Sequence, residues 1–367
     1  MTTATAASHP LEERVKDALR QELARRASAM GTPAATPDVT PAPVEEEKPI
    51  EVGKGQQLFS KLLKQRLPKG LHDFAVSLHN VKSLPTQVVA FVPAASPTYN
   101  IQVDEAHALM QAWEMGEKVL ITGPTGSGKS SLVEYCCALT GRPFIRINMT
   151  GDIESSVLFG SLVVEGGATV WKDGPVTEAV RYGAVVCIDE WDVTPPEILF
   201  GLQYLLEEGG KLFLKEMPGD STEKFIVPHK DFRLVCSGNT VGQGDDVGRF
   251  AGTTVQNVAS IDRFQTTIVL DYLAASHETK IINDTCAGLA SGMAEKMVSF
   301  AALVRTSNKQ GNINLSVSPR TLINWGRKAI QFKNNEHALR LAFANKLRES
   351  DRKIVGEFYQ KVFGTAL

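Results

Sequence analysis

The chain has 367 residues, of which 43% are hydrophobic and 22% are charged, a balance that excludes a disordered or fibrous protein. Its 39 Lys and Arg residues nearly match its 41 Asp and Glu residues, and the net charge of −2 gives no overall basic field for nucleic acid or acidic lipid. The length allows one large α/β domain, a smaller second domain and a tail.

The first 55 residues are predicted to form a flexible tail that contains a short amphipathic helix. Residues 10–30 fit this helix, because Pro10 suits a first helical turn and apolar residues recur at helical spacing. Residues 31–49 are rich in Pro, Ala and Thr and include an acidic run, so they cannot bury enough apolar surface to fold. The helix is either a docking element for a partner or a frayed tail, and the sequence leaves both open.

Three further segments are expected along the chain. Residues 56–102 alternate apolar and polar stretches and are expected to pack as a lead-in region onto the domain that follows. In residues 103–271, short apolar segments rich in Val, Ile and Phe alternate with helical patterns, which indicates a parallel sheet covered by helices on both faces. Residues 272–367 are mainly helical in pattern and form a predicted smaller domain.

The individual elements of the α/β domain follow from the same patterns. Strands are predicted at residues 118–122, 144–148, 184–189, 232–237 and 266–270, and the first two helices at 104–113 and 129–139. Two hairpins are predicted to interrupt the alternation, at residues 161–172 and 211–230, because both stretches contain glycine or proline where a turn is needed.

The cysteines and the apolar segments indicate a cytoplasmic protein. The five cysteines are an odd number without a CxxC pair and mostly lie in apolar runs, as reduced and packed thiols do. No apolar run approaches the roughly 20 residues that a membrane-spanning helix needs, and the N-terminus lacks the hydrophobic core of a signal peptide. We therefore expect no membrane segment.

A glycine-rich segment between the first strand and the helix after it fits the pattern G-x-x-x-x-G-K-[ST]. The predicted nucleotide-binding set is Gly123, Pro124, Thr125, Gly126, Ser127, Gly128, Lys129, Ser130 and Ser131. Glycines let backbone N–H groups and a helix N-terminus wrap closely around phosphate oxygens. Lys129 would reach the β- and γ-phosphates of ATP, and Ser130 would bind Mg²⁺. The alternative, a glycine-rich turn with an unrelated lysine, is disfavoured by the flanking strand and helix.

Two carboxylates end the predicted strand at residues 184–189. Because ligands of open α/β sheets bind at the C-terminal edge of the strands, Asp189 is suited to the Mg²⁺ shell. Glu190 would polarise the attacking water as a general base. Paired acids at a strand end are often only a solvated turn, but the glycine-rich pattern upstream favours a catalytic pair.

Three more polar residues complete the predicted site. Asn239 follows the strand at 232–237 and could hydrogen-bond the γ-phosphate or the water. Arg263, just before the last strand, is a candidate finger that reaches into the nucleotide site of a neighbouring subunit. Arg320 would begin a helix of the second domain and contact phosphate in its own subunit. Without their context, an Asn after a strand is usually a turn residue, and an Arg is usually a surface residue or part of a salt bridge. The context favours a functional role, because an ATPase needs cations that reach the nucleotide only when ring and lid close.

These residues, in this order, resemble AAA+ ATPases, and other segments resemble the MoxR-type branch, namely residues 158–160, 171–179 and 187–190. Members of that branch carry an extra hairpin in helix 2 and another before sensor 1, where the two hairpins are predicted. Further segments look like the CobS-type ATPase subunits of aerobic cobaltochelatases, namely residues 238–245, 252–254, 261–263, 318–325 and 343–363. The resemblance covers residues 95–365.

The resemblance implies an AAA+ P-loop core, an α-helical lid, and hydrolysis of ATP with Mg²⁺. By this resemblance, Lys129 is the Walker A lysine, and Asp189 and Glu190 are the Walker B pair. Asn239 is sensor 1, Arg263 is the arginine finger, and Arg320 is sensor 2. Such proteins form homo-oligomeric rings, usually hexamers. They work with a partner protein that carries a von Willebrand A-type domain.

The leading interpretation is an ATP-driven ring motor that remodels a partner protein or complex. The runner-up is a cobaltochelatase subunit that drives cobalt into a corrin ring held by other chains, since the seven histidines show no metal-ligand spacing of their own. A nucleotide-switched scaffold has no need of the predicted base and finger. A nucleic-acid motor is disfavoured by the charge balance, although Lys211, Lys215 and Lys230 in a predicted hairpin keep it open.

Overall fold

The computed structural model describes residues 51–244 and 252–367. The helix predicted at residues 10–30 lies outside the described residues, and the domain boundaries proposed from the sequence stay predictions. Within the described ranges, no helix has both the length and the apolar character needed to cross a bilayer. All five cysteines are buried and unpaired, in agreement with packed thiols.

The lead-in region contains two short strands and short helices, and its residues Phe59 and Val76 pack against the first long helix. Its elements are β1 (Gln56–Leu58), α2 (Phe59–Leu63), β2 (Ala75–Ser77), η1 (Val81–Ser83) and α3 (Thr86–Val89), and β1 pairs antiparallel with β2. Phe59 stacks on Phe74 with ring centroids 5.3 Å apart, and both rings meet the edge of His107 in α4 (Val103–Met115). The aromatic cluster thus attaches this region to the sheet-covering helix α4.

A five-stranded parallel sheet forms the centre of the molecule, in the order β11-β3-β10-β7-β4. The strands are β3 (Val119–Thr122), β4 (Phe144–Asn148), β7 (Val185–Asp189), β10 (Arg233–Gly238) and β11 (Thr266–Val269). All five predicted strands are confirmed, each within one residue at either end. The strand order brings β3, β10 and β7 side by side although they are far apart in the sequence.

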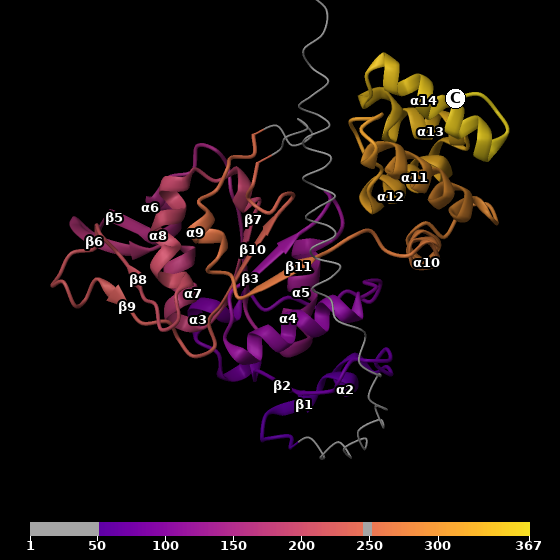
Figure 1. The fold of residues 1–367 in the computed structure, drawn as a ribbon. Coiled ribbons are helices and arrows are strands. Elements are labelled where there is room, and N and C mark those ends of the chain that lie inside the picture. The colour runs from indigo at the N-terminus through magenta and orange to yellow at the C-terminus, as the bar shows by residue number, and fades with distance from the viewer. Residues whose placement is uncertain (1–50, 245–251) are drawn as a thin grey trace, which may run out of the picture. The chain divides into compact units, whose positions relative to one another are not determined.

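Helices cover both faces of this sheet (Figure 1). One face packs against α4 and α5 (Lys129–Thr140), and the other against α7 (Pro175–Tyr182) and α8 (Pro196–Leu206). Along β7, Val185 and Cys187 belong to the first core and Val186 and Ile188 to the second. Burial on both faces explains why the strands are uninterrupted apolar runs.

Both predicted hairpins are present. The first joins β5 (Gly160–Glu165) to β6 (Ala168–Asp173), between α6 (Ser155–Phe159) and α7. The second pairs only two residues on each side, in β8 (Leu212–Phe213) and β9 (Phe225–Ile226), so most of residues 211–230 is loop rather than strand.

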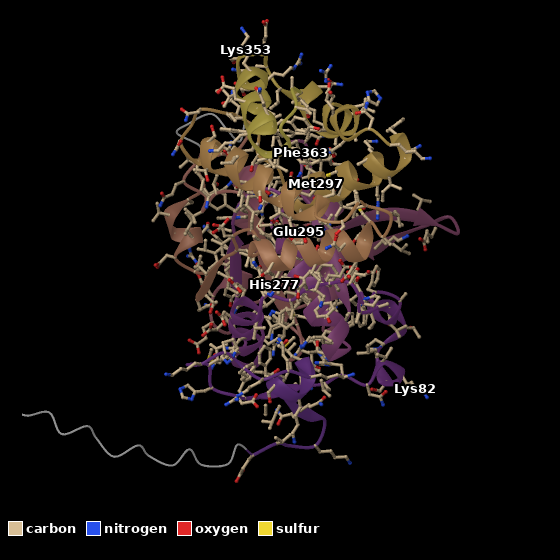
Figure 2. All side chains as sticks on the ribbon, turned by 90° about the vertical axis from the view of Figure 1, so that its right-hand side faces the viewer. Lys82, His277, Glu295, Met297, Lys353 and Phe363 are labelled. Atoms are coloured by element: carbon tan, nitrogen blue, oxygen red, sulfur yellow. The ribbon has the colours of Figure 1, made fainter. Side chains whose placement is uncertain are left out.

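The C-terminal part is helical, as predicted. It consists of α10 (Ala275–Thr285), α11 (Met293–Lys309), α12 (Pro319–Phe332), α13 (Asn335–Ala342), η3 (Ala344–Lys346) and α14 (Glu349–Phe363). Phe300, Trp325 and Tyr359 form an aromatic centre with Met297. Figure 2 shows Met297 and Phe363 among these helices and Lys353 extending from the surface.

A buried ion pair joins α10 to α11. Both guanidinium end nitrogens of Arg305 donate to the carboxylate of Glu278, at 2.7 and 2.9 Å, and its Nε donates to the Val317 carbonyl oxygen at 2.8 Å. Two charges removed from water are stable only when their partners satisfy them. This pair therefore fixes the two helices and the segment before α12 relative to one another.

We predict that Glu278→Ala lowers the free energy of unfolding by about 3 kcal/mol, because it leaves the Arg305 charge buried without a counterion. Urea denaturation followed by circular dichroism measures the change. Lys353→Ala is the matched control, since the side chain of Lys353 is 77% exposed in its ion pair with Glu349, and its effect should stay within about 0.5 kcal/mol. Equal losses in the two variants would contradict the assignment.

Candidate functional site

The strand register brings the ends of four strands to one edge of the sheet. Asp189 lies opposite Asn148 on one side and Ser237 on the other, and Gly238 lies opposite Thr122. The residues that follow Thr122, Asp189 and Gly238 in the chain are therefore neighbours in space. They include the glycine-rich loop, Glu190 and Asn239.

The glycine-rich loop turns tightly between β3 and α5. Gly123, Gly126 and Gly128 all have positive φ, at 147°, 78° and 96°. At Gly126 a Cβ atom would lie 2.5 Å from the Cβ of Ser318, the N-cap of α12, so both the backbone angle and the space require glycine. The loop thus packs closely against the beginning of a helix from the C-terminal part.

Lys129 begins α5 and points back into the loop. Its Nζ donates to the carbonyl oxygens of Gly123 at 2.8 Å and Pro124 at 3.2 Å, and to Oδ1 of Asn239 at 3.0 Å. Burial lowers the pKa of Lys129, and the carboxylate of Asp189 is the strongest of the nearby charges that oppose this shift. The predicted Walker A lysine and sensor 1 are therefore in direct contact.

Asp189 is nearly buried at the end of β7. Its Oδ1 accepts a hydrogen bond from the hydroxyl of Ser237, and its Oδ2 accepts one from the guanidinium of Arg146 in β4. Arg146 was not predicted from the sequence. The signal was the alternation of Arg146 and Asn148 with two isoleucines, which is typical of a strand with one polar face.

Glu190 has a left-handed backbone, with φ 57° and ψ 39°, and its side chain is exposed in the cleft. Few residues other than glycine adopt these angles, which cost on the order of 1 kcal/mol and cluster at functional sites. The strand therefore ends after Asp189. Asp189 is buried, whereas the next residue, Glu190, is exposed to solvent.

Asp192 was also missed by the sequence analysis. It is fully buried, and its Oδ2 accepts hydrogen bonds from the backbone N–H of Asn239 at 2.9 Å, the N–H of Thr240 at 2.8 Å and the Thr240 hydroxyl at 2.9 Å. The available signal was a third acid close behind Asp189 and Glu190. Asp192 fixes the loop that carries Asn239.

These elements surround a cleft of about 720 Å³. Its lining includes residues 125–131 of the predicted nucleotide-binding set, together with Asp189, Glu190, Asn239 and Arg320. Arg320 comes from the first turn of α12, at the predicted start of a helix. Arg327, about two turns further along α12 on the same side of the helix, also lines the cleft and was not singled out from the sequence.

Arg263 does not line this cleft, and neither do Gly123 and Pro124 at the beginning of the glycine-rich loop. Arg263 is 29% exposed, its Nη2 lies 3.1 Å from Oε1 of Glu207 in α8, and its Nη1 donates to the Ala259 carbonyl oxygen at 2.6 Å. Within one chain the structure thus gathers the loop, the paired acids, Asn239 and Arg320, and leaves Arg263 on the surface.

Tyr99 adds an aromatic wall to the cleft from the lead-in region. Its ring centroid lies 4.6 Å from that of Tyr135 in α5, and burial raises the pKa of its hydroxyl. No sequence pattern marked Tyr99, because the cleft forms only when residues before α4 fold back beside α5.

Tyr272 links the glycine-rich loop to the C-terminal helices. Its hydroxyl lies 3.2 Å from the Thr125 carbonyl oxygen and 3.3 Å from the Ser316 hydroxyl. The guanidinium of Arg305 lies 3.9 Å from the centroid of its ring, an arrangement that favours a cation–π contact. The buried Arg305–Glu278 pair is thereby connected to the wall of the cleft.

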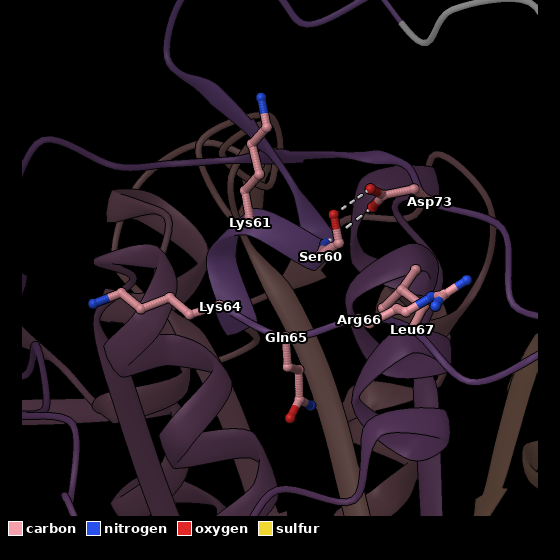
Figure 3. A pocket seen from close by; sticks show the side chains of 7 residues that line it. All are labelled: Ser60, Lys61, Lys64, Gln65, Arg66, Leu67 and Asp73. Atoms are coloured by element: carbon pink, nitrogen blue, oxygen red, sulfur yellow. Dashed lines mark hydrogen bonds between the residues drawn. The ribbon is translucent and has the colours of Figure 1, made fainter.

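A second hollow, of about 670 Å³, lies in the lead-in region and shares no lining residue with the cleft. Figure 3 shows the side chains of Lys61, Lys64 and Arg66 around it, and Asp73 hydrogen-bonded to Ser60. The carboxylate of Asp73 is already hydrogen-bonded, and the other charged side chains of this hollow are basic. This hollow therefore lacks the groups that a catalytic site would need.

Family comparisons agree with the geometry of the cleft. Residues 118–250 match the AAA domain (dynein-related subfamily), and residues 278–357 match the CbbQ/NirQ/NorQ C-terminal family. The chain is 32% identical over 286 residues to the aerobic cobaltochelatase subunit CobS of Sinorhizobium sp, an alignment that covers 76% of this chain and 85% of that protein. The chain is a MoxR-type AAA+ ATPase.

Other relatives agree with this assignment. Protein CbbQ of Hydrogenophilus thermoluteolus is 27% identical over 234 residues, covering 64% of this ATPase and 82% of that protein. A solved structure of RuvB from Thermotoga maritima aligns with a TM-score of 0.45 and 13% identity, covering 75% of this chain and 81% of that one. A likeness that weak supports no functional comparison. The predicted resemblance, the fold class and the ATPase activity are confirmed by the family, which implies nucleotide binding.

We predict that Gly126→Ala weakens nucleotide binding at least about tenfold, because the added methyl group meets Ser318 and a positive φ disfavours any side chain. Equilibrium titration with a fluorescent ATP analogue measures the change. Gly151→Ala is the control, since Gly151 has open space around it and no positive φ. Unchanged nucleotide affinity in the Gly126 variant would contradict this prediction, because it would show that the loop accommodates a Cβ atom at this position.

Proposed function

We propose that this MoxR-type ATPase binds ATP with Mg²⁺ in the 720 Å³ cleft, hydrolyses it between neighbouring subunits of a ring, and uses the energy to remodel a partner protein. The observation that carries the proposal is the distribution of the predicted residues. The cleft of one chain holds a phosphate loop, paired acids, a polar sensor and Arg320, whereas Arg263 lies on the surface. A complete site then needs a second chain.

The glycine-rich loop and α5 provide the phosphate site. The N-terminus of α5 and the loop N–H groups favour negative charge, and Lys129 already lies among the loop carbonyl groups. Arg320 and Arg327 face the same space from α12 and would balance further charge on the triphosphate. Tyr99 offers an aromatic face to the nucleoside, since it lines the cleft beside α5.

The residues at the end of β7 fit a magnesium ion. Mg²⁺ prefers oxygen ligands and is commonly held by one or two protein groups together with substrate phosphates and water. Ser130 and Asp189 supply a hydroxyl and a carboxylate on the lining of the cleft. Bound Mg²⁺ would neutralise charge on the β- and γ-phosphates.

Glu190 and Asn239 are proposed to act on the attacking water. Glu190 is exposed in the cleft and free of the hydrogen bonds that hold Asp189, so it can accept the proton as water attacks the γ-phosphorus and ADP leaves. Asn239 contacts Lys129 and therefore lies where the γ-phosphate is expected. The pair combines proton acceptance with recognition of the terminal phosphate.

Arg263 is proposed to enter the cleft of the neighbouring subunit. Its ion pair with Glu207 is partly exposed, and such a pair contributes about 1 kcal/mol or less, so it can be exchanged for a phosphate contact. An arginine delivered in trans stabilises charge that spreads over the transferred phosphoryl group. This requires a homo-oligomer, which the family resemblance suggests is a hexameric ring.

The hairpin formed by β5 and β6 is the proposed contact with the partner protein. Val164, near its turn, is 75% exposed, and Leu162 and Val170 are also exposed. Apolar side chains presented on a projecting hairpin fit a polypeptide better than a polyanion. The family resemblance suggests a partner with a von Willebrand A-type domain.

A cobaltochelatase subunit is the second candidate, favoured by the 32% identity to CobS. Among the described residues, no group of three or more His, Cys, Asp or Glu side chains could hold a metal ion, and in this second function another chain would supply the site for cobalt and the corrin. Reconstitution with a corrin-binding subunit and cobalt would distinguish the two functions: cobalt insertion that depends on ATP favours chelation.

We predict that Glu190→Gln retains ATP binding and assembly but lowers hydrolysis by about 100-fold or more, because an amide cannot accept the proton. Lys129→Ala should instead lose nucleotide binding. Phosphate release and nucleotide titration measure the two effects. Glu295→Gln, at an exposed position of α11 (Figure 2), is the control and should behave as the parent protein. Unchanged turnover in the Glu190 variant would remove the proposed mechanism.

We predict that Arg263→Ala lowers hydrolysis by about 1,000-fold, because the transition state loses a cation supplied by the neighbouring subunit. Mixing this variant with Glu190→Gln should restore part of the activity, since the Glu190 variant still supplies Arg263 to an intact cleft. Arg340→Ala, which breaks another partly exposed ion pair, is the control. Co-assembly without any recovery would exclude a shared site.

A further inference from the structure

The short helix η2 (Trp191–Val193) follows Glu190 directly and is buried although Glu190 is exposed. Trp191 and Asp192 expose 1% and 0% of their surfaces. A buried carboxylate is stable only if donors surround it. The donors of Asp192, and the neighbours of Trp191, come from two other segments that both matter to the proposed function.

The first segment carries Asn239. Asp192 accepts hydrogen bonds from the N–H groups of Asn239 and Thr240, and Gly238 lies so close to Trp191 that an added Cβ would be 2.8 Å from its ring. Asn239 in turn accepts a hydrogen bond from Lys129. A γ-phosphate that binds Lys129 would compete for that bond, so the cleft and η2 are joined through one loop.

The second segment leads to Arg263. The N–H of Thr254 donates to the Asp192 carbonyl oxygen at 2.8 Å, and its hydroxyl donates to the same oxygen at 3.2 Å. Gln256 is buried, and its side-chain amide donates to the Thr194 carbonyl oxygen at 3.0 Å and to the Thr254 hydroxyl at 2.7 Å. Residues 254–256 are therefore tied to η2 by its backbone.

The path from Gln256 to Arg263 is short. Asn257 caps α9 (Val258–Ile261) by accepting from the N–H of Ala259, and Arg263 donates to the carbonyl oxygen of the same Ala259. Phe264, next to Arg263, meets the ring of Trp191 edge-on with centroids 5.5 Å apart. The segment from Thr254 to Phe264 therefore contacts η2 at both of the segment's ends, through Thr254 to Asp192 and through Phe264 to Trp191.

We propose that η2 couples the nucleotide cleft of a subunit to the arginine which that subunit presents to its neighbour. Asp192, Trp191 and Thr254 are positioning residues in this coupling. Because a buried carboxylate that loses its donors is strongly destabilised, movement of the Asn239 loop shifts η2 and residues 254–256 together. Binding of a γ-phosphate in one cleft therefore changes the placement of Arg263 in the next. This inference rests on the proposed shared site.

Thr254 allows a test outside the cleft. Thr254→Val keeps the shape of the side chain but removes the hydroxyl that binds Asp192 and Gln256. We expect assembly and nucleotide affinity within about twofold of the parent protein and a loss of kcat of about tenfold or more, as for a misplaced catalytic group. Thr254→Ser retains the hydroxyl and should restore kcat to within about twofold.

Mixed rings identify the cleft in which the defect lies. Glu190→Gln subunits are expected to bind ATP without hydrolysing it and to carry an intact Arg263, so mixing them with Thr254→Val subunits should recover activity. Gln256→Met removes the amide contacts at similar side-chain volume and should show the same loss and recovery of activity. It replaces Thr254→Val in the test if the Thr254 variant has a lowered melting temperature. Unchanged kcat in both variants, or co-assembly without recovery, overturns the coupling.

Arg263→Ala, measured in parallel, distinguishes a failure of the proposed coupling from a failure of the proposed shared site. If Arg263→Ala is inactive and recovers on mixing while Thr254→Val and Gln256→Met behave as the parent protein, the coupling is wrong and the shared site stands. If Arg263→Ala itself is fully active, the shared site is wrong, and the coupling falls with it.

Discussion

The parallel alignment of β3, β10 and β7 determines where the polar groups of the cleft lie. Each strand is buried on both faces, so its side chains are fixed by packing, and its polar residues lie near the strand ends. A slip of one residue in this register would move apolar side chains between the two cores. The register therefore brings Lys129 into contact with Asn239 and places Asp189 beside Ser237 at the same edge of the sheet, although these residues lie far apart in the sequence.

The sequence predicted the strands well because continuous apolar runs have one explanation in an α/β protein. It also predicted the loop and Asp189, whose patterns are local. Asp192, Arg146 and Tyr99 were missed for a common reason, since each matters through atoms of distant segments. The donors to Asp192, for example, are mainly backbone N–H groups, which leave no mark on side-chain patterns. The domain boundaries and the roles of the site residues remain predictions.

The position of Arg263 changes how the other residues are understood. Arg320 and Arg327 line the cleft of their own chain, whereas Arg263 pairs with Glu207 outside it. In the proposed shared site, a subunit on its own lacks the cation that Arg263 supplies and would hydrolyse ATP slowly. Assembly would then both complete the chemistry and fix the direction in which subunits influence each other, from one cleft to the next.

The phenol of Tyr272 contacts the loop at Thr125 and the segment before α12 at Ser316, with Arg305 over its ring. The two contacts lie on different parts of the chain, so any rotation of the C-terminal helices about residues 270–275 has to lengthen at least one of them. The environment of the Tyr272 ring therefore depends on the orientation of the C-terminal helices. The ring resonances of Tyr272 in a nuclear magnetic resonance spectrum would report a change in that orientation without an added label.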